Sequence, residues 1–519
     1  MLLIHPPLVK PCEPPAGIAK LAGCLNRHHI KCTVVDANLE IILDLLKPND
    51  AGDFFAHSPQ DTWTARARRH VMRNVQFLTS CHGYGNIDRY NRTVRDINRV
   101  IERSTMDMDI RLSLSNYLDQ QHSPVSSMDL LKVAEGPEQN PFYLYFKRRL
   151  LGLLEDEAPS IVGFSLNYLN QALCTFAMVG FLKRVHPPIR IILGGGLVTS
   201  WIKNPAWRNP FKGLVDDLVA GAGEVPLLSI LGIKHKGGYD SPDDTVLSKK
   251  GYLSPGTILP YSSSRGCYWK RCSFCPEKAE ENLWEPEPVE STIANIHNLT
   301  AKINPVLVHF LDNAVSPAHL KAIGDYPFGV PWYGFARISS HLQDKDFCMK
   351  LRQSGCVMLQ IGVESGDQEV LNDMQKGFEL KTASAILANL HEVGIAAYVY
   401  LIFGTPTETL EKARKTLDFT VTNSRYIRFL NLAIFNLPAY GAEAQKLQTG
   451  DFYEGDLSLY RSFLHPKGWN RNLVRGFLDR EFKRHPAITP IIRRTPPIFT
   501  SNHASFFCAD LKTLRINRL

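Results

Sequence analysis

The sequence predicts an α/β protein with two parallel sheets in succession: a doubly wound sheet first, then a partial (β/α)6 barrel. Two observations predict this fold. Short, nearly continuous apolar runs alternate with helical periods over residues 1–235 and again over 255–440, as expected for parallel strands covered on both faces. A polar stretch rich in Gly and Pro, 234–244, separates the two series. With 519 residues, the chain is long enough for two or three domains.

The first domain, 1–235, is expected to be a flavodoxin- or Rossmann-like sheet. Its expected strands are Leu2–Ile4, Cys32–Asp36, Ile161–Ser165, Ile191–Leu193 and Asp217–Ala220. A charged stretch with helical periods interrupts this sheet at about 50–155. A connection of that length is far longer than normal between two strands. We therefore expect a helical insertion there.

Polar and glycine residues follow several of these strands, where open parallel sheets bind ligands. The segments are Asp36-Ala37-Asn38, Ser165-Leu166-Asn167, Gly194-Gly195-Gly196-Leu197-Val198-Thr199 and Gly221-Ala222-Gly223-Glu224. Glycine allows a backbone to approach a ligand closely, although tight turns alone also explain a glycine run. Four such segments in one sheet favour a ligand-binding edge.

The second domain, 250–440, is expected to form a TIM-like partial barrel. Its expected strands are 257–262, 306–311, 332–336, 357–362, 397–403 and 427–435. Helical periods lie between them, including Val289–Lys302 and Thr409–Thr422. In barrels of this kind the chemistry lies at the carboxyl ends of the strands. Residues 441–519 are expected to be a C-terminal helical extension.

Three cysteines, Cys267, Cys272 and Cys275, follow the first expected barrel strand with the spacing C-x4-C-x2-C. Closely spaced thiolates are typical iron–sulfur ligands. Three of them hold three corners of a cluster and leave the fourth iron open to a ligand. Structural zinc held by three cysteines and a distant histidine is an alternative, and so are unrelated buried thiols.

Three charged residues, Asp312, Arg337 and Glu364, stand beside later barrel strands. Buried charge is costly unless it is paired or bound to a ligand. One interpretation is an Arg–carboxylate pair that holds the barrel together. The other is a binding site for a zwitterionic nucleoside.

The segment from Gly266 to Cys275, Gly-Cys-Tyr-Trp-x-x-Cys-x-Phe-Cys, resembles the cluster loop of radical S-adenosylmethionine (SAM) enzymes. That loop is usually C-x3-C-x2-C, and the extra residue here is similar to a variant in members that also carry a cobalamin-binding domain. The resemblance implies a [4Fe–4S] cluster on the three cysteines. In the family the open iron binds SAM, and reduction cleaves SAM to a 5′-deoxyadenosyl radical.

The resemblance also implies roles for residues at later strand ends. Phe274 is similar to the aromatic residue beside the adenine, and Glu364 and Ser365 to residues that face the ribose hydroxyls, which suit a carboxylate acceptor. Asp312 stands near the position that meets the methionyl amine, and Arg337 is included in the same site. Gly404-Thr405-Pro406 resembles the turn that packs near the adenine. Met374-x-Lys376-Gly377 resembles a recurring family segment, to which no chemistry is assigned.

The first half resembles the cobalamin-binding domain found ahead of radical SAM barrels. The matching segments are Pro14-Pro15-Ala16-Gly17-Ile18-Ala19, Asp36-Ala37-Asn38, Gly194-Gly195-Gly196 and Gly221-Ala222-Gly223-Glu224. The cobalamin-facing residues implied are Ser165, Gly194, Gly195, Thr199 and Gly221. The Asp-x-His-x-x-Gly motif that ligates cobalt in many cobalamin proteins is absent. Many relatives bind cobalamin without it, and some bind none.

Composition limits which cellular compartment and which binding partners are expected. No run of about 18 apolar residues is present, so no membrane span is expected. Eleven scattered cysteines and a start unlike a signal peptide favour the cytoplasm. The net charge of +8 is mild and includes a basic C-terminal tail, so nucleic acid is a less favoured partner than a small-molecule or peptide substrate. Flavodoxin or ferredoxin is the expected electron donor.

The main hypothesis is a radical SAM enzyme that methylates an unactivated carbon with the help of cobalamin. One alternative is a radical SAM rearrangement, cyclisation or thioether-forming enzyme with a vestigial cobalamin domain. Another is a non-catalytic zinc- or cluster-binding scaffold that binds RNA through its basic tail. The sequence does not identify the substrate.

Overall fold

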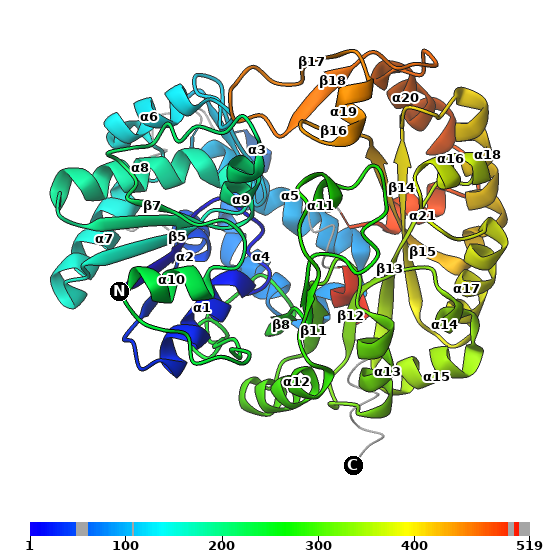
Figure 1. The fold of residues 1–519 in the computed structure, drawn as a ribbon, viewed down its shortest axis with the longest axis horizontal. Helices are drawn as coiled ribbons and strands as arrows, with labels where there is room; N and C mark the ends of the chain where they lie inside the picture. The colour runs from blue at the N-terminus through cyan, green and yellow to red at the C-terminus, as the bar shows by residue number, and fades with distance from the viewer. Residues whose placement is uncertain (48–60, 106–107, 497–502, 508–519) are drawn as a thin grey trace. The chain divides into compact units, whose positions relative to one another are not determined.

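Two parallel sheets organise the chain (Figure 1). The computed structural model describes residues 1–47, 61–105, 108–496 and 503–507. The chain divides into two units by its internal contacts. The first unit comprises Met1–Thr257 and Tyr453–Leu459, and the second comprises Ile258–Phe452 and Tyr460–Leu519.

The first unit contains a five-stranded, entirely parallel sheet. In sheet order its strands are β2 (Thr33–Asp36), β1 (Leu2–His5), β5 (Ile161–Ser165), β6 (Arg190–Gly194) and β7 (Asp217–Leu218). Numbered along the chain, this order is 2-1-3-4-5, the flavodoxin-like doubly wound arrangement. The predicted parallel sheet is therefore confirmed. Its switch point, where the strand order reverses, lies between β1 and β5.

Helices cover this sheet. They are α1 (Ala16–Arg27), α2 (Ala37–Leu45), α8 (Leu169–Val185), α9 (Gly196–Lys203) and α10 (Glu224–Ile230). Every residue of α8 from Gln171 to Leu182 is buried, which is typical of a helix enclosed on all sides. Part of that cover comes from α6 (Ser127–Glu135), which packs along α8.

The segment between α2 and β5 is only partly helical. Its described helices, besides α6, are α3 (Thr62–Arg69), α4 (Val71–Leu78), α5 (Ile87–Arg103) and α7 (Tyr143–Glu157). It also contains an antiparallel hairpin of β3 (Ile110–Leu112) and β4 (Tyr117–Asp119), which the prediction of a helical insertion lacked. Three-residue strands are too short to show a period of two. Parts of the expected insertion, 48–60 and 106–107, lie outside the described residues.

The second unit contains a six-stranded parallel sheet, which confirms the predicted strand–helix units. In sheet order its strands are β15 (Ile427–Ile434), β14 (Ala396–Phe403), β13 (Cys356–Glu364), β12 (Trp332–Ala336), β11 (Leu307–Phe310) and β8 (Ile258–Tyr261). The intervening helices include α12 (Val289–Ile303), α13 (Pro317–Asp325), α15 (Lys345–Gln353), α17 (Leu380–Glu392) and α18 (Leu410–Thr422). The barrel is partial because β8 and β15 are edges. Strand β8 contains a proline, Pro260.

The region after β15 differs from the predicted helical extension. A three-stranded antiparallel sheet is formed by β16 (Leu437–Pro438), β18 (Tyr460–Phe463) and β17 (Thr449–Asp451). Most residues of β17 and β18 are exposed or half-buried, so these strands carry no apolar signal. The described helices of this region include α19 (Ala442–Lys446), α20 (Arg471–Phe477) and α21 (Thr489–Arg494).

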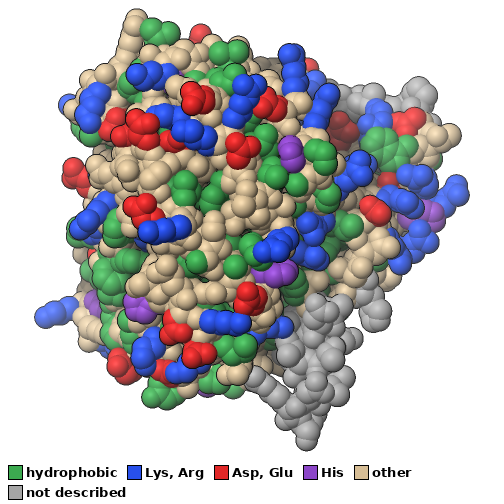
Figure 2. Space-filling model, turned by 90° about the vertical axis from the view of Figure 1, so that its right-hand side faces the viewer, with side chains coloured by type: hydrophobic (Ala, Val, Ile, Leu, Met, Phe, Trp, Pro, Cys, Tyr) green, Lys and Arg blue, Asp and Glu red, His purple; other side chains and the backbone are tan. Residues whose placement is uncertain are grey.

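The surface bears charges of both signs. On the described part of the face in Figure 2, lysine and arginine side chains are interspersed with aspartate and glutamate. Such a mixture is typical of a solvated protein surface rather than of a nucleic-acid footprint. None of the helices in the described ranges combines the length and the apolar character that crossing a bilayer requires.

Candidate functional site

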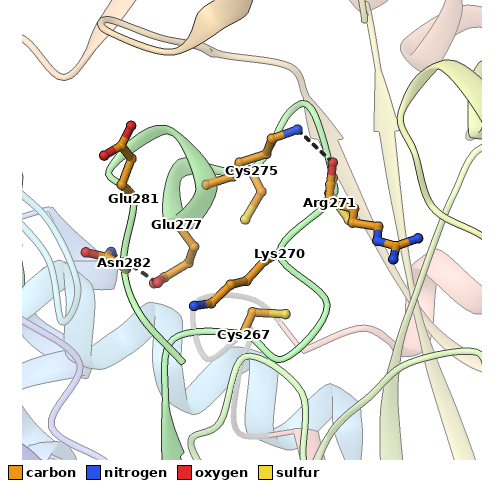
Figure 3. Close-up of a pocket in the computed structure, with 9 residues that line it drawn as sticks. Cys267, Lys270, Arg271, Cys275, Glu277, Glu281 and Asn282 are labelled. Atoms are coloured by element: carbon orange, nitrogen blue, oxygen red, sulfur yellow. Dashed lines mark hydrogen bonds between the residues drawn. The ribbon is translucent and has the colours of Figure 1, made fainter. Parts of the chain in front are cut away.

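The cysteine loop begins where β8 ends and encloses a small cavity. Short strands β9 (Ser264–Arg265) and β10 (Glu285–Pro286) pair across its base, and α11 (Pro276–Ala279) follows it. Cys267, Cys272 and Cys275 all line this cavity of about 250 Å³ (Figure 3). The other residues that line it are Lys270, Arg271, Glu277, Lys278, Glu281 and Asn282. The structure thus brings the three predicted metal ligands together.

Burial and nearby cations act in opposite directions on the thiols. Burial raises the pKa of Cys275 to about 11 and also raises the pKa of Cys272, whereas the charges of Lys376 and Arg337 lower the latter. A metal takes the place of the thiol proton when it binds. The two cations then face a thiolate, so the cavity suits an anionic iron–sulfur cluster.

Asp312 fixes the start of the cysteine loop. Its carboxylate accepts hydrogen bonds from the Ser263 backbone N–H at 2.9 Å, from the Ser263 hydroxyl at 2.8 Å and from the Ser264 hydroxyl at 2.6 Å. The side chain is 1% exposed. A buried carboxylate with three donors is well compensated. The structure therefore gives Asp312 protein partners, while its contact with the methionyl amine stays a prediction.

Glu364 and Phe274 meet at a buried lysine. The Lys376 ammonium lies 3.0 Å from Glu364 Oε1, and both side chains are less than 10% exposed. The same ammonium lies 5.6 Å from the centre of the Phe274 ring. Glu364 has a φ of +69° beside an irregularity in the pairing of β13 with β14. This backbone turns the carboxylate back over Gly362, where a Cβ would lie 2.3 Å from Glu364 Oε1.

The remaining predicted SAM residues form separate local networks. The Ser365 hydroxyl is fully buried, lies 3.2 Å from Thr416 Oγ1 and accepts the Asp367 backbone N–H at 3.1 Å. The Gly404 N–H donates to Glu408, which also accepts the Trp469 indole N–H at 2.9 Å. Burial raises the pKa of Glu408 to about 7. Ser365 and Gly404 are therefore held by partners other than the Glu364–Lys376 pair.

Sequence reasoning overlooked the segment Asp373–Gly377 as part of the site. Arg337 Nη2 donates to the Lys376 carbonyl at 2.6 Å, and Ser273 N–H donates to the Met374 carbonyl at 3.1 Å. The only sequence signal was the Met374-x-Lys376-Gly377 pattern. A single lysine in a polar stretch normally indicates a solvated surface, which is why the buried role of Lys376 could not be read from it.

In the first unit, the five residues predicted to face cobalamin lie at the ends of β5 and β6, in the first turn of α9 or in the loop after β7. The Leu166 N–H donates to the Gly194 carbonyl at 2.8 Å. The Thr199 hydroxyl donates to the Gly195 carbonyl at 2.8 Å and accepts the Gly221 N–H at 2.9 Å. Thr199 therefore ties the ends of β6 and β7 together.

Two glycines of this edge have backbone geometry that favours glycine. Gly195 has a φ of +110°, and a Cβ there would lie 2.4 Å from the Leu166 carbonyl oxygen. Gly221 has a φ of +71°, and no described atom lies within 4 Å of its hypothetical Cβ. Asn167 braces the neighbouring loop, since its side chain donates to Ser165 Oγ and accepts the Gly196 N–H, both at 3.0 Å. The edge is rigid and leaves open space at Gly221.

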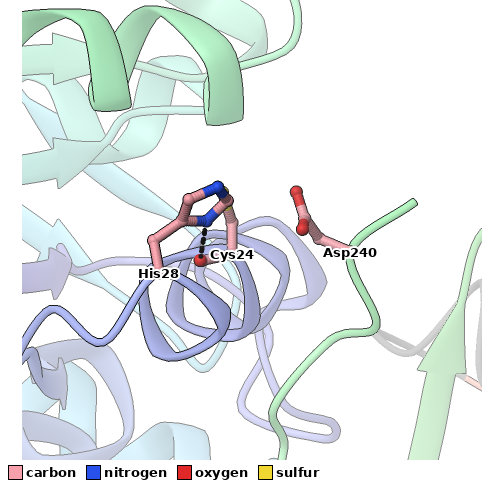
Figure 4. Close-up of side chains that lie close together, drawn as sticks. All are labelled: Cys24, His28 and Asp240. Atoms are coloured by element: carbon pink, nitrogen blue, oxygen red, sulfur yellow. Dashed lines mark hydrogen bonds between the residues drawn. The ribbon is translucent and has the colours of Figure 1, made fainter. Parts of the chain in front are cut away.

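A second group of potential metal ligands, Cys24, His28 and Asp240, lies in the first unit (Figure 4). Each already has protein partners. His28 Nδ1 lies 2.9 Å from the Cys24 carbonyl, and His28 Nε2 accepts the Lys236 N–H at 3.1 Å. Arg27 pairs with Asp240 at 2.9 Å. These contacts fasten the polar segment 234–244 to α1.

Comparison with protein families finds a match within the second unit. Residues 261–420 match the model of the Radical SAM superfamily. This stretch lies in the second unit and includes the cysteine loop, so the match falls on the segment whose resemblance to radical SAM enzymes the sequence showed.

Two further comparisons find individual proteins that are similar to this chain. Over 177 residues the chain is 32% identical to bacteriochlorophyllide d C-12(1)-methyltransferase of Chlorobaculum tepidum, an alignment that covers 32% of this chain and 38% of that protein. The chain thus spans well under half of that relative's length.

Two solved structures share the fold. One is the radical SAM methyltransferase TsrM from Kitasatospora setae with tryptophan substrate and a SAM analogue bound, with a TM-score of 0.58, 13% identity, and 100% of this chain and 98% of that chain covered. The other is the cobalamin-dependent SAM radical enzyme OxsB with aqua-cobalamin bound, with a TM-score of 0.51, 15% identity, and 69% and 65% covered. These likenesses confirm the predicted two-sheet architecture.

Proposed function

We propose that the chain is a cobalamin-dependent radical SAM methyltransferase that acts on an unactivated carbon of its substrate. The observation that carries the proposal is the three-cysteine cavity beside the buried Glu364–Lys376 pair, within a radical SAM domain. The cluster would supply one electron to SAM, whose C5′–S bond then breaks to give methionine and a 5′-deoxyadenosyl radical.

The residues of the second unit bind and orient in this proposal. Cys267, Cys272 and Cys275 ligate the cluster. Glu364 accepts the ribose hydroxyls and Phe274 packs against the adenine, while Lys376 neutralises Glu364 until the nucleoside arrives. Asp312, Arg337, Ser365 and Gly404 complete the proposed SAM site, and the hydrogen bonds of Asp312, Ser365 and Gly404 hold the loops on which they stand. The half-buried cavity limits the access of water to the radical.

The first unit is proposed to hold cobalamin at the carboxyl ends of β5, β6 and β7. Ser165, Gly194, Gly195, Thr199 and Gly221 form that edge. The support is physical: these five residues are uncharged, hydrogen bonds of Thr199 join two of the strand ends, and the edge is open at Gly221, as suits a large ligand recognised by shape. Bound there, cobalamin would supply the methyl group. The likeness to a cobalamin-dependent enzyme and to a methyltransferase supports the same proposal.

The proposed partners follow from the chemistry. The cluster needs a single-electron donor, so flavodoxin or ferredoxin is proposed, in the cytoplasm, where thiols stay reduced. The substrate is proposed to be a small molecule or a peptide. One relative is a bacteriochlorophyllide d methyltransferase, and one similar structure has tryptophan bound as its substrate. Neither compound is assigned to this chain.

Anaerobic reconstitution tests the proposal. Wild-type chain with iron, sulfide, cobalamin, SAM and a reductant is expected to bind about four irons and about one cobalt per chain and to release 5′-deoxyadenosine. The control is the variant with Cys267, Cys272 and Cys275 all changed to Ala, which keeps the first unit intact. If wild type releases no more 5′-deoxyadenosine than this control, the radical reading is wrong. If it releases 5′-deoxyadenosine but retains no cobalt, the methyltransferase reading is wrong.

A further inference from the structure

Trp269 lies inside the longer gap of the cysteine loop and joins that loop to Asp373–Gly377. Its indole N–H donates to the Gln375 carbonyl at 2.9 Å. The Arg337 guanidinium carbon lies 3.9 Å from the centre of its ring, within the distance of a strong cation–π contact. Arg271 lies against the same ring at 4.9 Å. Trp269 is thus held by one hydrogen bond and two cations.

Gly377 matches this arrangement in shape. It has a φ of +74°, and a Cβ there would come within 2.3 Å of the Trp269 ring. Both the backbone angle and the space therefore require glycine at 377. The Arg337 guanidinium closes the arrangement, because Nη2 also donates to the Lys376 carbonyl at 2.6 Å.

The shorter gap of the loop is attached to the same segment. The Ser273 N–H donates to the Met374 carbonyl at 3.1 Å, and its hydroxyl donates to the Asp373 carbonyl at 3.3 Å. Both intervals between the cysteines, the four-residue one through Trp269 and the two-residue one through Ser273, therefore rest on Asp373–Gly377. That segment also carries Lys376, the partner of Glu364.

We infer that Trp269, Arg337 and Gly377 are positioning residues, which fix the place of the cysteine loop relative to the Glu364–Lys376 pair. This inference rests on the proposed cluster and SAM site and adds to them a mechanical link. The extra residue in the C-x4-C interval gives the loop room to extend Trp269 onto Gln375 and Gly377. A cluster whose loop is not clamped keeps its three thiolates, but its open iron no longer stands at a fixed place beside Glu364.

Two substitutions separate the parts of the clamp. Trp269→Phe keeps an aromatic ring for the cations and removes the N–H donor. Gly377→Ala adds a methyl group that would collide with the Trp269 ring. The matched control is Trp63→Phe in the first unit, because Trp63 likewise donates its indole N–H, to Asp96 at 2.8 Å, and lies under a guanidinium, that of Arg99, at 4.9 Å.

The first measurement is the rate at which the reconstituted, reduced cluster loses iron to a chelator. We expect about a tenfold faster loss in Gly377→Ala and a several-fold faster loss in Trp269→Phe, since a hydrogen bond and a cation–π contact are weakened, with no change in Trp63→Phe. In a Trp269→Ala background, Gly377→Ala should add little, because the ring it strikes is gone. Additive effects, or wild-type rates in both variants, would overturn the inference.

The second measurement distinguishes positioning from mere support of the fold. The electron paramagnetic resonance spectrum of the reduced cluster is recorded before and after SAM is added. Positioning predicts that Gly377→Ala, measured at a temperature where the variant is fully folded and holds its full iron content, shows a smaller SAM-dependent spectral change than wild type. An unchanged spectral response in that variant contradicts the inference. Should wild type itself show a cluster but no SAM response, the proposed function fails, and the chelator experiment still decides on the clamp.

Discussion

The two sheets present ligand-facing edges of opposite character. The edge of the first unit is built from glycines and hydroxyl groups, and the five residues predicted to bind there carry no charge. The site of the second unit gathers Glu364, Lys376 and Arg337 around three thiols. A neutral, rigid edge selects a ligand by shape, whereas buried charge selects a ligand of matching charge. The two sites should therefore respond to different kinds of substitution.

The largest expected effect is that of removing the buried cation. Lys376→Met leaves the Glu364 carboxylate buried without its partner, and breaking such a pair costs about 3–5 kcal/mol. Hydrogen exchange of the amides in β13 and β14 is expected to report that loss, with the amides of β5 and β6 unchanged.

Lys415→Met is the matched control. Lys415 also pairs with a carboxylate at 3.0 Å, that of Asp367, but the lysine side chain is 53% exposed. Because exposed pairs contribute about 0–1 kcal/mol, this variant should lose little. Equal losses in the two variants would show that burial does not set the value of the Glu364–Lys376 pair.

A pH series is expected to affect both units, because among the described residues burial raises the pKa of one carboxyl group in each unit. Asp244 in the first unit and Glu408 in the second both have a pKa raised to about 7, from ordinary values of 3.8 and 4.5. The folded chain keeps a proton on each group that the unfolded chain releases, so the contribution of these two groups to stability is largest below pH 4 and falls as the pH rises to 7. Up to pH 7, Asp244 accounts for about 4 kcal/mol of this fall and Glu408 for about 3 kcal/mol.

Isosteric amides test the assignment of this pH dependence. Asp244→Asn should flatten the slope between pH 4 and 7 for amides of the first unit only, and Glu408→Gln for amides of the second unit only. Urea denaturation followed by hydrogen exchange at each pH measures both slopes. A slope that survives its own amide substitution assigns the titration to another group.

Gly195→Ala tests how tightly the ligand-facing edge of the first unit is packed. The new methyl group meets the Leu166 carbonyl oxygen at 2.4 Å on a backbone with a φ of +110°, which should cost about 2–3 kcal/mol. Gly213→Ala, with a φ of +88° and no described atom within 4 Å of the new Cβ, should cost only the smaller backbone strain. The difference between the two free energies of unfolding isolates the steric part.

The smallest expected effect is that of Thr199→Val. It removes the hydroxyl that joins Gly195 to Gly221 and leaves the Gly221 N–H without its acceptor, at a cost of about 1 kcal/mol. Binding of cobalamin, followed by its visible absorption, should weaken modestly while SAM cleavage without substrate is unchanged. Thr422→Val, which removes an exposed hydroxyl bonded to the Asp418 carbonyl in the second unit, is the control.

Long apolar periods made the framework predictable. The strand ending in Ser165 and the helix from Thr409 to Thr422 were placed to within a residue or two, because near-continuous burial leaves a strong pattern. The hairpin Ile110–Asp119 and the sheet around Tyr460–Phe463 were missed, because their strands are short and partly exposed.

The candidate site was less predictable than the fold. The spacing of Cys267, Cys272 and Cys275 is local, so the sequence shows it directly. The partners of Glu364 and Trp269 are not local, since one helix separates Glu364 from Lys376 and 106 residues separate Trp269 from Gln375. For the same reason the hydrogen bonds of Asp312 to Ser263 and Ser264, about fifty residues earlier, could not be read from the residue types.

The open edge of the six-stranded sheet has a consequence for self-association. A parallel sheet that does not close exposes a row of backbone donors and acceptors, with which a second chain can pair. Strand β8 is such an edge, only four residues long, and its Pro260 has no N–H to offer. The residues of β8 are also buried, so this edge offers a second chain few backbone groups with which to pair, at the same strand that leads into the cysteine loop.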